Sequence, residues 1–451
     1  MYTEISYIQA LTFSKTLGQY HNIVYFHSAK QSRALGRYSF IAIDPFKVWT
    51  VDSTDQHDIF SQLLSELKQY QFDTILNLPP FQGGLAGYIS YDIARDIETL
   101  PNIAKEDIAY PKLILGYYDL IISFDHFQSK AWIISSGFPE TEDAKQKIRA
   151  ELRLHWLLNQ ILNATENNNR INYFIAENNI KSNFTKTAYI KAINKIKKYI
   201  LKGDIFEANL TQRFECALPN HFDTYALFEK INHYNPAPFA SYIQFGNLSI
   251  ISSSPERFIK LDHQIVETRP IKGTIRRSNN SIEDQELAEK LLSSEKDRAE
   301  NIMIVDLMRN DLSRVCEPHS VIVSQLCEIE SYENIHHLVS VILGKLNDTE
   351  NIVTLLKATL PGGSITGAPK IRAMEIIDKL EPTRRGPYCG NAIYIGFDGN
   401  MDSSILIRSY VIAHNKITFQ AGGAIVLDSN PEEEYDEMRM KTDLLRQVLI
   451  A

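Results

Sequence analysis

Residues 267–274 read Glu-Thr-Arg-Pro-Ile-Lys-Gly-Thr, and their proline and glycine predict a turn that carries Lys272. A lysine beside a glycine is ordinarily a solvated surface amine. Two features favour a second interpretation. Arg269, Arg276 and Arg277 bring positive charge close to the amine, which lowers a lysine pKa toward the neutral, nucleophilic form. Gly273 leaves space for a substrate to approach. Lys272 is therefore a candidate covalent nucleophile, and the surface amine is the alternative.

The composition of the chain excludes several classes of protein. The 451 residues can form two or three average domains or one large one. A net charge of -8 argues against nucleic-acid partners, because there is no basic excess to displace counterions. No apolar run is long enough for a membrane span, and residues 1–15 lack the order of a signal peptide. Four cysteines without a C-x-x-C pair exclude a zinc ribbon and fit a reducing compartment. We expect a cytoplasmic metabolic enzyme.

Short β-rich runs dominate the first part of the chain. Strands are predicted at 23–26, 38–43 and 47–51, a hairpin from 113–124 with 130–135, and a glycine-rich turn into a strand at 82–88. A helix is predicted over 143–163, and the polar run 163–170 is the best linker. This run divides an N-terminal region, residues 1–170, from a C-terminal region, residues 171–451.

The C-terminal region begins with a helical pattern. Tyr189, Ile193, Ile196 and Ile200 recur at helical spacing, and Gly203 ends the helix. Further strands are predicted at 204–214, at 242–245 paired with 248–252 around Gly-Asn, and at 391–397, 403–412 and 416–420. A helix is predicted over 371–379.

Two predicted helices each carry a pair of acids three residues apart, Asp297 with Glu300 and Glu434 with Glu437. Residues at this spacing share a helix face, and both pairs lie on the stripe that continues into apolar residues. An unpaired carboxylate is costly there. A divalent cation would remove that cost, and an all-carboxylate set favours Mg²⁺ over zinc. The alternative is that basic residues such as Arg298 and Lys441 neutralise the acids.

Other candidates are single residues and loops. Glu256 follows a strand and a Ser-Ser-Ser-Pro run, where a buried acid can protonate a leaving hydroxyl or simply begin a helix. His337 lies in an apolar segment and is either a core residue or a catalyst. Arg408, at a strand end, needs a carboxylate partner. The glycine-rich segments 362–370 and 421–424 can bind anions through backbone N–H groups.

The ordered motifs together resemble the chorismate-utilising enzymes. The resemblance rests on residues 203–210 (GDIFEANL), 252–257 (SSSPER), 270–274 (PIKGT), 299–311, 337–340 (HLVS), 367–370 (GAPK) and 400–408, and more loosely on 36–41 and 83–88. It implies an α+β fold in which two antiparallel β-sheets pack as a sandwich with peripheral helices. Strands from both regions would contribute, which gives one intertwined unit.

Lys272 indicates the branch of the family. Anthranilate synthases usually have a small residue within Pro-Ile-x-Gly-Thr, whereas a lysine there is typical of the aminodeoxychorismate synthases. The resemblance implies that Lys272 attacks C2 of chorismate while Glu256 protonates the departing C4 hydroxyl. Ammonia then adds at C4 and expels the lysine, which gives 4-amino-4-deoxychorismate for 4-aminobenzoate and folate synthesis.

The resemblance also implies the remaining site residues. Mg²⁺ would be held by Glu300 and Glu437, with Asp297 and Glu434 nearby. Substrate-binding positions correspond to Thr274, Tyr388, Arg408, Gly422, Gly423 and Lys441. His337 matches a site residue of open role. At Glu207 the amine-adding members usually have glutamine, and at Ala424 the family usually has glycine.

A Gly-x-Cys-x-Gly glutaminase nucleophile is absent from the sequence, so the resemblance implies that a separate glutamine amidotransferase subunit supplies ammonia. Two other functions are considered. An anthranilate synthase component would release anthranilate and pyruvate. A non-catalytic subunit that only binds chorismate or tryptophan would be expected to lose Glu256, Glu300 or Glu437, and all three are present.

Overall fold

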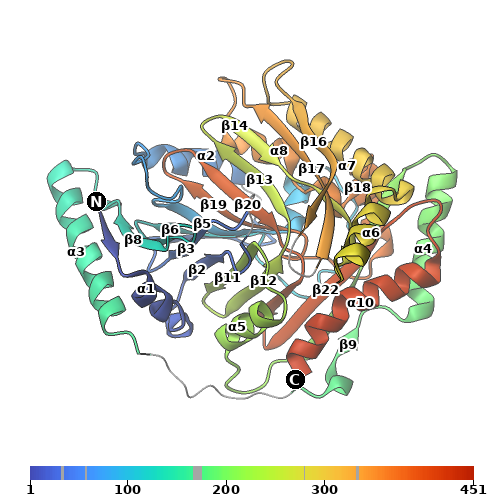
Figure 1. The fold of residues 1–451 in the computed structure, drawn as a ribbon, viewed down its shortest axis with the longest axis horizontal. Coiled ribbons are helices and arrows are strands. Elements are labelled where there is room, and N and C mark those ends of the chain that lie inside the picture. The colour runs from blue at the N-terminus through green and yellow to red at the C-terminus, as the bar shows by residue number, and fades with distance from the viewer. Residues whose placement is uncertain (32–34, 56–57, 166–174, 279, 332–334, 451) are drawn as a thin grey trace.

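Two antiparallel β-sheets form the body of the protein, and helices cover their outer faces (Figure 1). The structure is a computed structural model that describes residues 1–31, 35–55, 58–165, 175–278, 280–331 and 335–450. Within these residues one sheet has twelve strands and the other has ten. The predicted α+β fold with two antiparallel sheets is confirmed.

Neighbouring strands in each sheet are often distant in sequence. The twelve-stranded sheet runs in the order β1 (Tyr2–Ile5), β8 (Lys130–Ser135), β7 (Leu120–Asp125), β3 (Tyr38–Ala42), β2 (Ile23–His27), β11 (Phe239–Phe245), β12 (Leu248–Ser254), β21 (Ser409–Ala413), β22 (Lys416–Ile425), β10 (Glu207–Ala217) and β18 (Gly367–Ala368), with β9 (Lys181–Ser182) on β10. The ten-stranded sheet runs in the order β15 (Ile271–Arg276), β17 (Ile335–Lys345), β14 (Ile265–Thr268), β13 (Arg257–Asp262), β20 (Met401–Ile405), β19 (Asn391–Gly396), β5 (Gly84–Ile89), β6 (Leu113–Tyr118) and β4 (Lys47–Val51), with β16 (Ile322–Ser331) on β17.

Apolar cores lie between the sheets and on both outer faces. The inner core joins residues such as Val24 and Ile243 of one sheet to Tyr88 and Ile114 of the other. The twelve-stranded sheet shares an apolar core with the helices α1 (Tyr7–Ser14), α3 (Asp143–Leu162), α4 (Lys186–Leu201), α5 (Thr224–Tyr234), α9 (Lys370–Leu380) and α10 (Pro431–Ile450). The ten-stranded sheet shares another apolar core with the helices α2 (Ile59–Gln69), α7 (Glu295–Ser313) and α8 (Ile352–Thr359). The helix α6 (Ser281–Leu292) packs on β15.

The helix predicted from residue 189 onward shows why the local pattern succeeds. On α4, Tyr189, Ile193 and Ile196 are buried in the protein core. Thr185, at the start of this helix, accepts a hydrogen bond from the N–H of Ala188. The spacing that buries one face and the side-chain cap therefore define the helix together.

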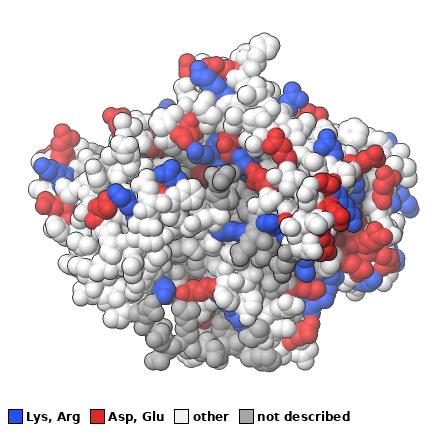
Figure 2. Space-filling view, in the orientation of Figure 1, with Lys and Arg blue, Asp and Glu red and all other residues white. Residues whose placement is uncertain are grey.

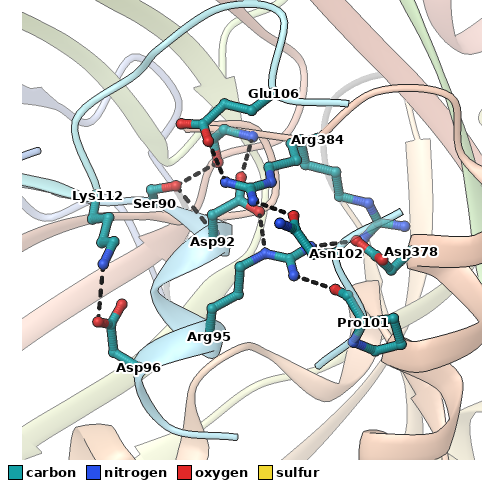
Figure 3. A network of polar contacts seen from close by, with 12 residues as sticks. Ser90, Asp92, Arg95, Asp96, Pro101, Asn102, Glu106, Lys112, Asp378 and Arg384 are labelled. Atoms are coloured by element: carbon teal, nitrogen blue, oxygen red, sulfur yellow. Dashed lines mark hydrogen bonds and ion pairs between the residues drawn. The ribbon is translucent and has the colours of Figure 1, made fainter. Parts of the chain in front are cut away.

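Both parts of the chain contribute strands to both sheets. β2 pairs with β11, and β5 pairs with β19. Figure 3 shows a polar network that joins the segment after β5 to α9 and the residues that follow it. Arg95 pairs with Asp378, the Ser90 hydroxyl donates to the carbonyl of Gly386, and Arg384 pairs with Glu106. The protein is therefore interleaved, as the resemblance implied. The boundary at residue 170 lies outside the described residues, as do most of residues 163–170, and it stays a prediction.

Two predicted strands are wrong in the same way. Residues 113–124 form β6 and β7, and residues 403–412 form β20 and β21, and in each case the chain passes from one sheet to the other. Asp119 marks the first crossing, where its buried carboxylate pairs with Arg153 of α3. Arg408 marks the second, with a φ of 50°. An apolar run cannot reveal such a break, because both strands remain buried on either side of it.

The surface carries charges of both signs. Figure 2 shows Lys and Arg side chains interspersed with Asp and Glu, and acids gather on the side where Figure 1 places α4 and α10. Across the described residues, none of the helices combines the length and apolar character needed to span a membrane.

Candidate active site

Lys272 lies on a strand, and the predicted turn at 268–274 is wrong. Thr268 ends β14, and β15 begins at Ile271, so only two residues separate the strands. The pairing register between β15 and β17 shifts between Lys272 and Thr274, which places a bulge at Gly273. Gly273 has a φ of 77°, and an added Cβ would lie 3.0 Å from Oδ1 of Asp297. Glycine is required there by backbone conformation and by the close approach of α7, and the space for a substrate stays a prediction.

Acids, rather than the expected arginines, surround Lys272. Its Nζ lies 3.2 Å from Oε1 of Glu207 on β10, and the Glu207 side chain is fully buried. Burial lowers the pKa of Lys272, but the charges of Glu207 and Glu300 outweigh burial and raise that pKa above its ordinary value. Arg269 pairs with Glu330, and Arg277 pairs with Asp284. The predicted lowering of the Lys272 pKa by arginines is therefore wrong.

Glu256 lies where the chain passes between the sheets, after β12 and before β13. The crossing at Arg408 runs beside it, because the N–H of Ser253 donates to the carbonyl of Arg408 and that of Ile405 donates to the carbonyl of Glu256. Burial raises the pKa of Glu256 to about 7, against the opposing effects of Ser364 and Lys272. The side chain can therefore hold a proton near neutral pH, as a general acid requires.

Arg408 and His337 complete this part of the site. Burial lowers the pKa of Arg408, and the charge of Glu256 opposes this effect. Among the described residues no carboxylate lies within 4.0 Å of its guanidinium. His337 Nδ1 lies 2.8 Å from Oγ1 of Thr274. Burial lowers the pKa of His337 to about 3, helped by the charge of Arg408, so the imidazole is neutral at pH 7.

The four acids lie on α7 and α10, and amines accompany two of them. Lys296 Nζ lies 3.2 Å from Oε1 of Glu434, and Lys441 Nζ lies 2.7 Å from Oε1 of Glu437. Burial raises the pKa of Glu300 to about 7, whereas Lys441 outweighs burial at Glu437 and lowers the pKa of that residue.

Asp297 has a local role at the start of α7. Its carboxylate accepts a hydrogen bond of 2.5 Å from the hydroxyl of Ser294, the residue that caps this helix. Within the described ranges, no three His, Cys, Asp or Glu side chains gather as a preformed metal cluster. The Mg²⁺ ligand set stays a prediction.

The remaining substrate positions lie on β22, on α10 and before β19. An added Cβ at Gly423 would lie 3.4 Å from Oε2 of Glu434 and 3.9 Å from Nζ of Lys441, so this strand approaches the acids closely. The carbonyl of Gly422 accepts a hydrogen bond of 3.1 Å from Lys441. Tyr388 is buried beside Cys389, and burial raises the pKa of its phenol.

Ala424 pairs with Asn209 within the β22–β10 ladder, where it has no positive φ. The backbone strain that a positive φ would impose on alanine therefore does not arise.

Sequence reasoning missed two contacts in this region. Glu207 is the partner of Lys272, and Lys296 is the partner of Glu434; both contacts join residues far apart in the chain, which no local pattern reveals. It also missed a cavity of about 380 Å³ lined by charged residues including Arg257, Arg269 and Asp402. That cavity shares none of the predicted site residues.

Comparison with known proteins gives the family. Residues 21–447 match the family model described as chorismate binding enzyme. The chain is 42% identical over 358 residues to the aminodeoxychorismate synthase component 1 of Salmonella typhimurium, which covers 79% of this chain and 75% of the relative. It is 35% identical over 427 residues to the anthranilate synthase component 1 of Acetivibrio thermocellus, which covers 92% and 86%.

A solved structure of similar fold is consistent with this family. Anthranilate synthase component I from Streptococcus pneumoniae superposes with a TM-score of 0.80 at 29% identity and covers 90% of this chain and 92% of that chain. The chain therefore belongs to the chorismate-binding enzymes, a family of chorismate-utilising enzymes.

Proposed function

We propose that this enzyme aminates chorismate at C4 to form 4-amino-4-deoxychorismate, through a covalent bond to Lys272. One observation carries the proposal: a buried amine and an acid whose pKa is about 7 share one site, at Lys272 and Glu256. An amine is a nucleophile once it has lost its proton, and a protonated carboxyl can release a hydroxyl as water. The relatives named aminodeoxychorismate synthase component 1 support this branch.

The site residues divide the chemistry among them. Nζ of Lys272 would form a bond to C2 as the C4–O bond breaks and Glu256 gives its proton to the leaving oxygen. Ammonia would then bond to C4 while the C2–Nζ bond breaks and its electron pair returns to Lys272. Arg408, with no carboxylate within 4.0 Å among the described residues, offers a guanidinium for a substrate carboxylate. Neutral His337 would hold Thr274 in place through their hydrogen bond.

The acids of α7 and α10 fit a magnesium ion chemically, because carboxylate oxygens are the donors that Mg²⁺ prefers. Glu300 and Glu437 would hold it, with Asp297 and Glu434 beside them. A bound Mg²⁺ would supply positive charge for a substrate carboxylate. The burial that raises the pKa of Glu300 supports this assignment, because a buried carboxylate gains most from a counter-charge.

Other parts of the proposal concern the cellular setting. A separate glutamine amidotransferase subunit would supply ammonia, as the component 1 names of the relatives suggest for those proteins. The four cysteines are buried free thiols, which fits a reducing cytoplasm. Residues 1–170 and 171–451 would act as two regions of one interleaved unit.

Anthranilate synthesis is the second candidate. The relative from Acetivibrio thermocellus named anthranilate synthase component 1 is 35% identical to the chain and covers 92% of it. The two reactions differ in what becomes of the side chain of chorismate, which anthranilate synthesis releases as pyruvate.

Product analysis distinguishes these candidates. The purified protein would be incubated with chorismate, Mg²⁺ and an ammonium salt, and the product followed by mass and fluorescence. We expect a non-fluorescent product that yields 4-aminobenzoate only after a lyase is added. Fluorescent anthranilate together with pyruvate would replace this proposal with the second candidate.

A further inference from the structure

The carboxylate of Glu207 is buried in an unusual setting for an acid. Its side chain is fully buried on β10, close to the edge of the twelve-stranded sheet. Oε1 lies 3.2 Å from Lys272 Nζ and 3.4 Å from the amide nitrogen of Asn209. Oε2 is buried and makes no hydrogen bond within the described part of the chain. An unsatisfied buried carboxylate oxygen is costly, so a structural ion pair alone leaves this arrangement unexplained.

Lys272 faces a matching difficulty. The amine must be neutral to attack carbon, yet the acids around it hold the proton in place. Among the described residues, Glu207 has the one carboxylate oxygen within 4.0 Å of Nζ. Within the described part of the chain, Glu207 is therefore the carboxylate that can directly accept a proton from Lys272.

We propose that in this protein Glu207, at a position where the amine-adding members usually have glutamine, is the base that takes the proton from Lys272 and so converts it to the free amine. This inference rests on the proposed lysine mechanism and adds a residue to it. The Nζ–H bond breaks, an Oε1–H bond forms, and the freed electron pair on Nζ makes the bond to C2. The C4 oxygen leaves as water with the proton of Glu256. Before and after the transfer the pair has no net charge, so burial does not forbid it.

The transfer changes the charges that a dianionic substrate would meet. Chorismate carries two carboxylates; a neutral Glu207 repels them less than an ionised one, and a neutral Lys272 attracts them less. The other charged groups near Lys272 and Glu207 are Glu256 after β12, Lys296 and Glu300 on α7, and Glu437 on α10. Among the described residues none of these groups forms an ion pair with Lys272, so they set the electrostatic background and do not receive the proton directly.

The protons balance over a full cycle. When ammonia bonds to C4, the C2–Nζ bond breaks, and Lys272 regains its electron pair. The neutral amine takes its proton back from Glu207. The C4 nitrogen loses a proton, which restores the acid form of Glu256. Chorismate and ammonia thus give aminodeoxychorismate and water with every group restored.

Replacing Glu207 by glutamine tests the role. Glu207→Gln keeps the size of the side chain and can still accept a hydrogen bond from Nζ, but it cannot take up a proton. The matched control is Glu215→Gln on the same strand, where Glu215 accepts from Lys416 at 3.1 Å. Rates of C4 amination would be measured from pH 6 to pH 10 at saturating chorismate, Mg²⁺ and ammonium, together with the KM for chorismate.

We expect the kcat of Glu207→Gln to fall about 100-fold at pH 7, the size of a typical general-base contribution. Glu256 loses its proton over the same pH range in both proteins, so the ratio of wild-type kcat to variant kcat should shrink as pH rises and Lys272 loses its proton to solvent. KM and the control should change little. A residue that only holds Lys272 in its charged state would behave in the opposite way. A kcat at pH 7 equal to or above that of the wild type would therefore overturn the role.

A second measurement does not depend on turnover. Labelling of Lys272 by a small amine-reactive reagent, quantified by peptide mass, gives the pH at which the amine becomes free. Glu207→Gln should shift this pH downward, because one of the charges that raise the Lys272 pKa is lost. An unchanged profile would overturn the coupling. A shifted profile without C4 amination by the wild type would overturn the proposed function while leaving the coupling of the two side chains in place.

Discussion

Lys296 Nζ lies 3.2 Å from Oε1 of Glu434 and thereby joins the first turn of α7 to the first turn of α10. Burial lowers the pKa of Lys296, but Glu434 and Glu300 outweigh burial and raise it. The ammonium therefore supplies, among these acids, part of the positive charge that a bound cation would provide.

Removing this amine should strengthen magnesium binding. Lys296→Met deletes a positive charge that competes with a cation for the same carboxylates. We expect the Mg²⁺ concentration for half-maximal activity to fall about fivefold, which corresponds to about 1 kcal/mol, the upper range for a partly exposed ion pair. Lys290→Met, on the neighbouring helix α6, is the control. A higher Mg²⁺ requirement in Lys296→Met would contradict the competition.

Loss of either proposed ligand should have the reverse effect. Glu300→Gln and Glu437→Gln each remove one negative charge, and we expect the half-saturating Mg²⁺ concentration to rise at least about tenfold. Titration of activity with Mg²⁺ measures this. Glu295→Gln, an exposed acid in the first turn of α7, should leave the titration unchanged. Identical curves for wild type and both ligand variants would return Glu300 and Glu437 to a structural role.

Glu256 should govern the alkaline loss of activity. Burial holds its pKa at about 7, and a general acid acts only while protonated. As pH rises through about 7 the protonated fraction falls, so kcat should fall toward tenfold per pH unit. Glu256→Gln cannot donate the proton, and its residual rate should lose this limb. A wild-type rate that is level from pH 6 to pH 9 would exclude Glu256 as the acid.

Acidification should destabilise the fold through buried histidines. Burial lowers the pKa of both His27 and His337 from 6.5 to about 3. The unfolded chain binds these protons below pH 6.5 and the folded chain does not, so stability is present above pH 6.5 and is lost as pH falls toward 3. Each histidine should lower the free energy of unfolding by about 1.4 kcal/mol per pH unit within that window.

Urea denaturation at pH 7, 6 and 5 measures this loss. Since His337→Gln has no imidazole to protonate, its stability should fall less steeply between pH 6 and pH 5 than that of the wild type. Equal slopes for the two proteins would show that the His337 pKa is not lowered in the fold.

The sequence was sufficient for structure that depends on local pattern. The alternating strands, the hairpin of β11 and β12 around Gly246, and the helix α4 follow from side-chain spacing and turn residues. Crossings between the sheets were missed. Asp119 and Arg408 interrupt apolar runs whose two halves are equally buried, and only the sheet to which each half belongs distinguishes them.

Electrostatics was predicted least well, because charge partners come from distant parts of the chain. Arg269 and Arg277 are close to Lys272 in sequence, but Glu330 and Asp284 neutralise them. Glu207 is 65 residues from Lys272 and contacts it directly. Proximity along a strand does not give proximity of side chains, which point to alternate faces.

The central claim is that Lys272 is the nucleophile, and Lys272→Arg tests it most directly. Arginine keeps the positive charge beside Glu207, so the buried acid remains paired, but a guanidinium does not lose its proton and cannot attack carbon. C4 amination of chorismate by wild type and variant would be measured side by side by product mass, with Lys272→Ala as a second variant and circular dichroism as the check of folding. We expect both variants to fold and neither to form 4-amino-4-deoxychorismate at a detectable rate. Amination by Lys272→Arg at the wild-type rate would contradict the lysine mechanism.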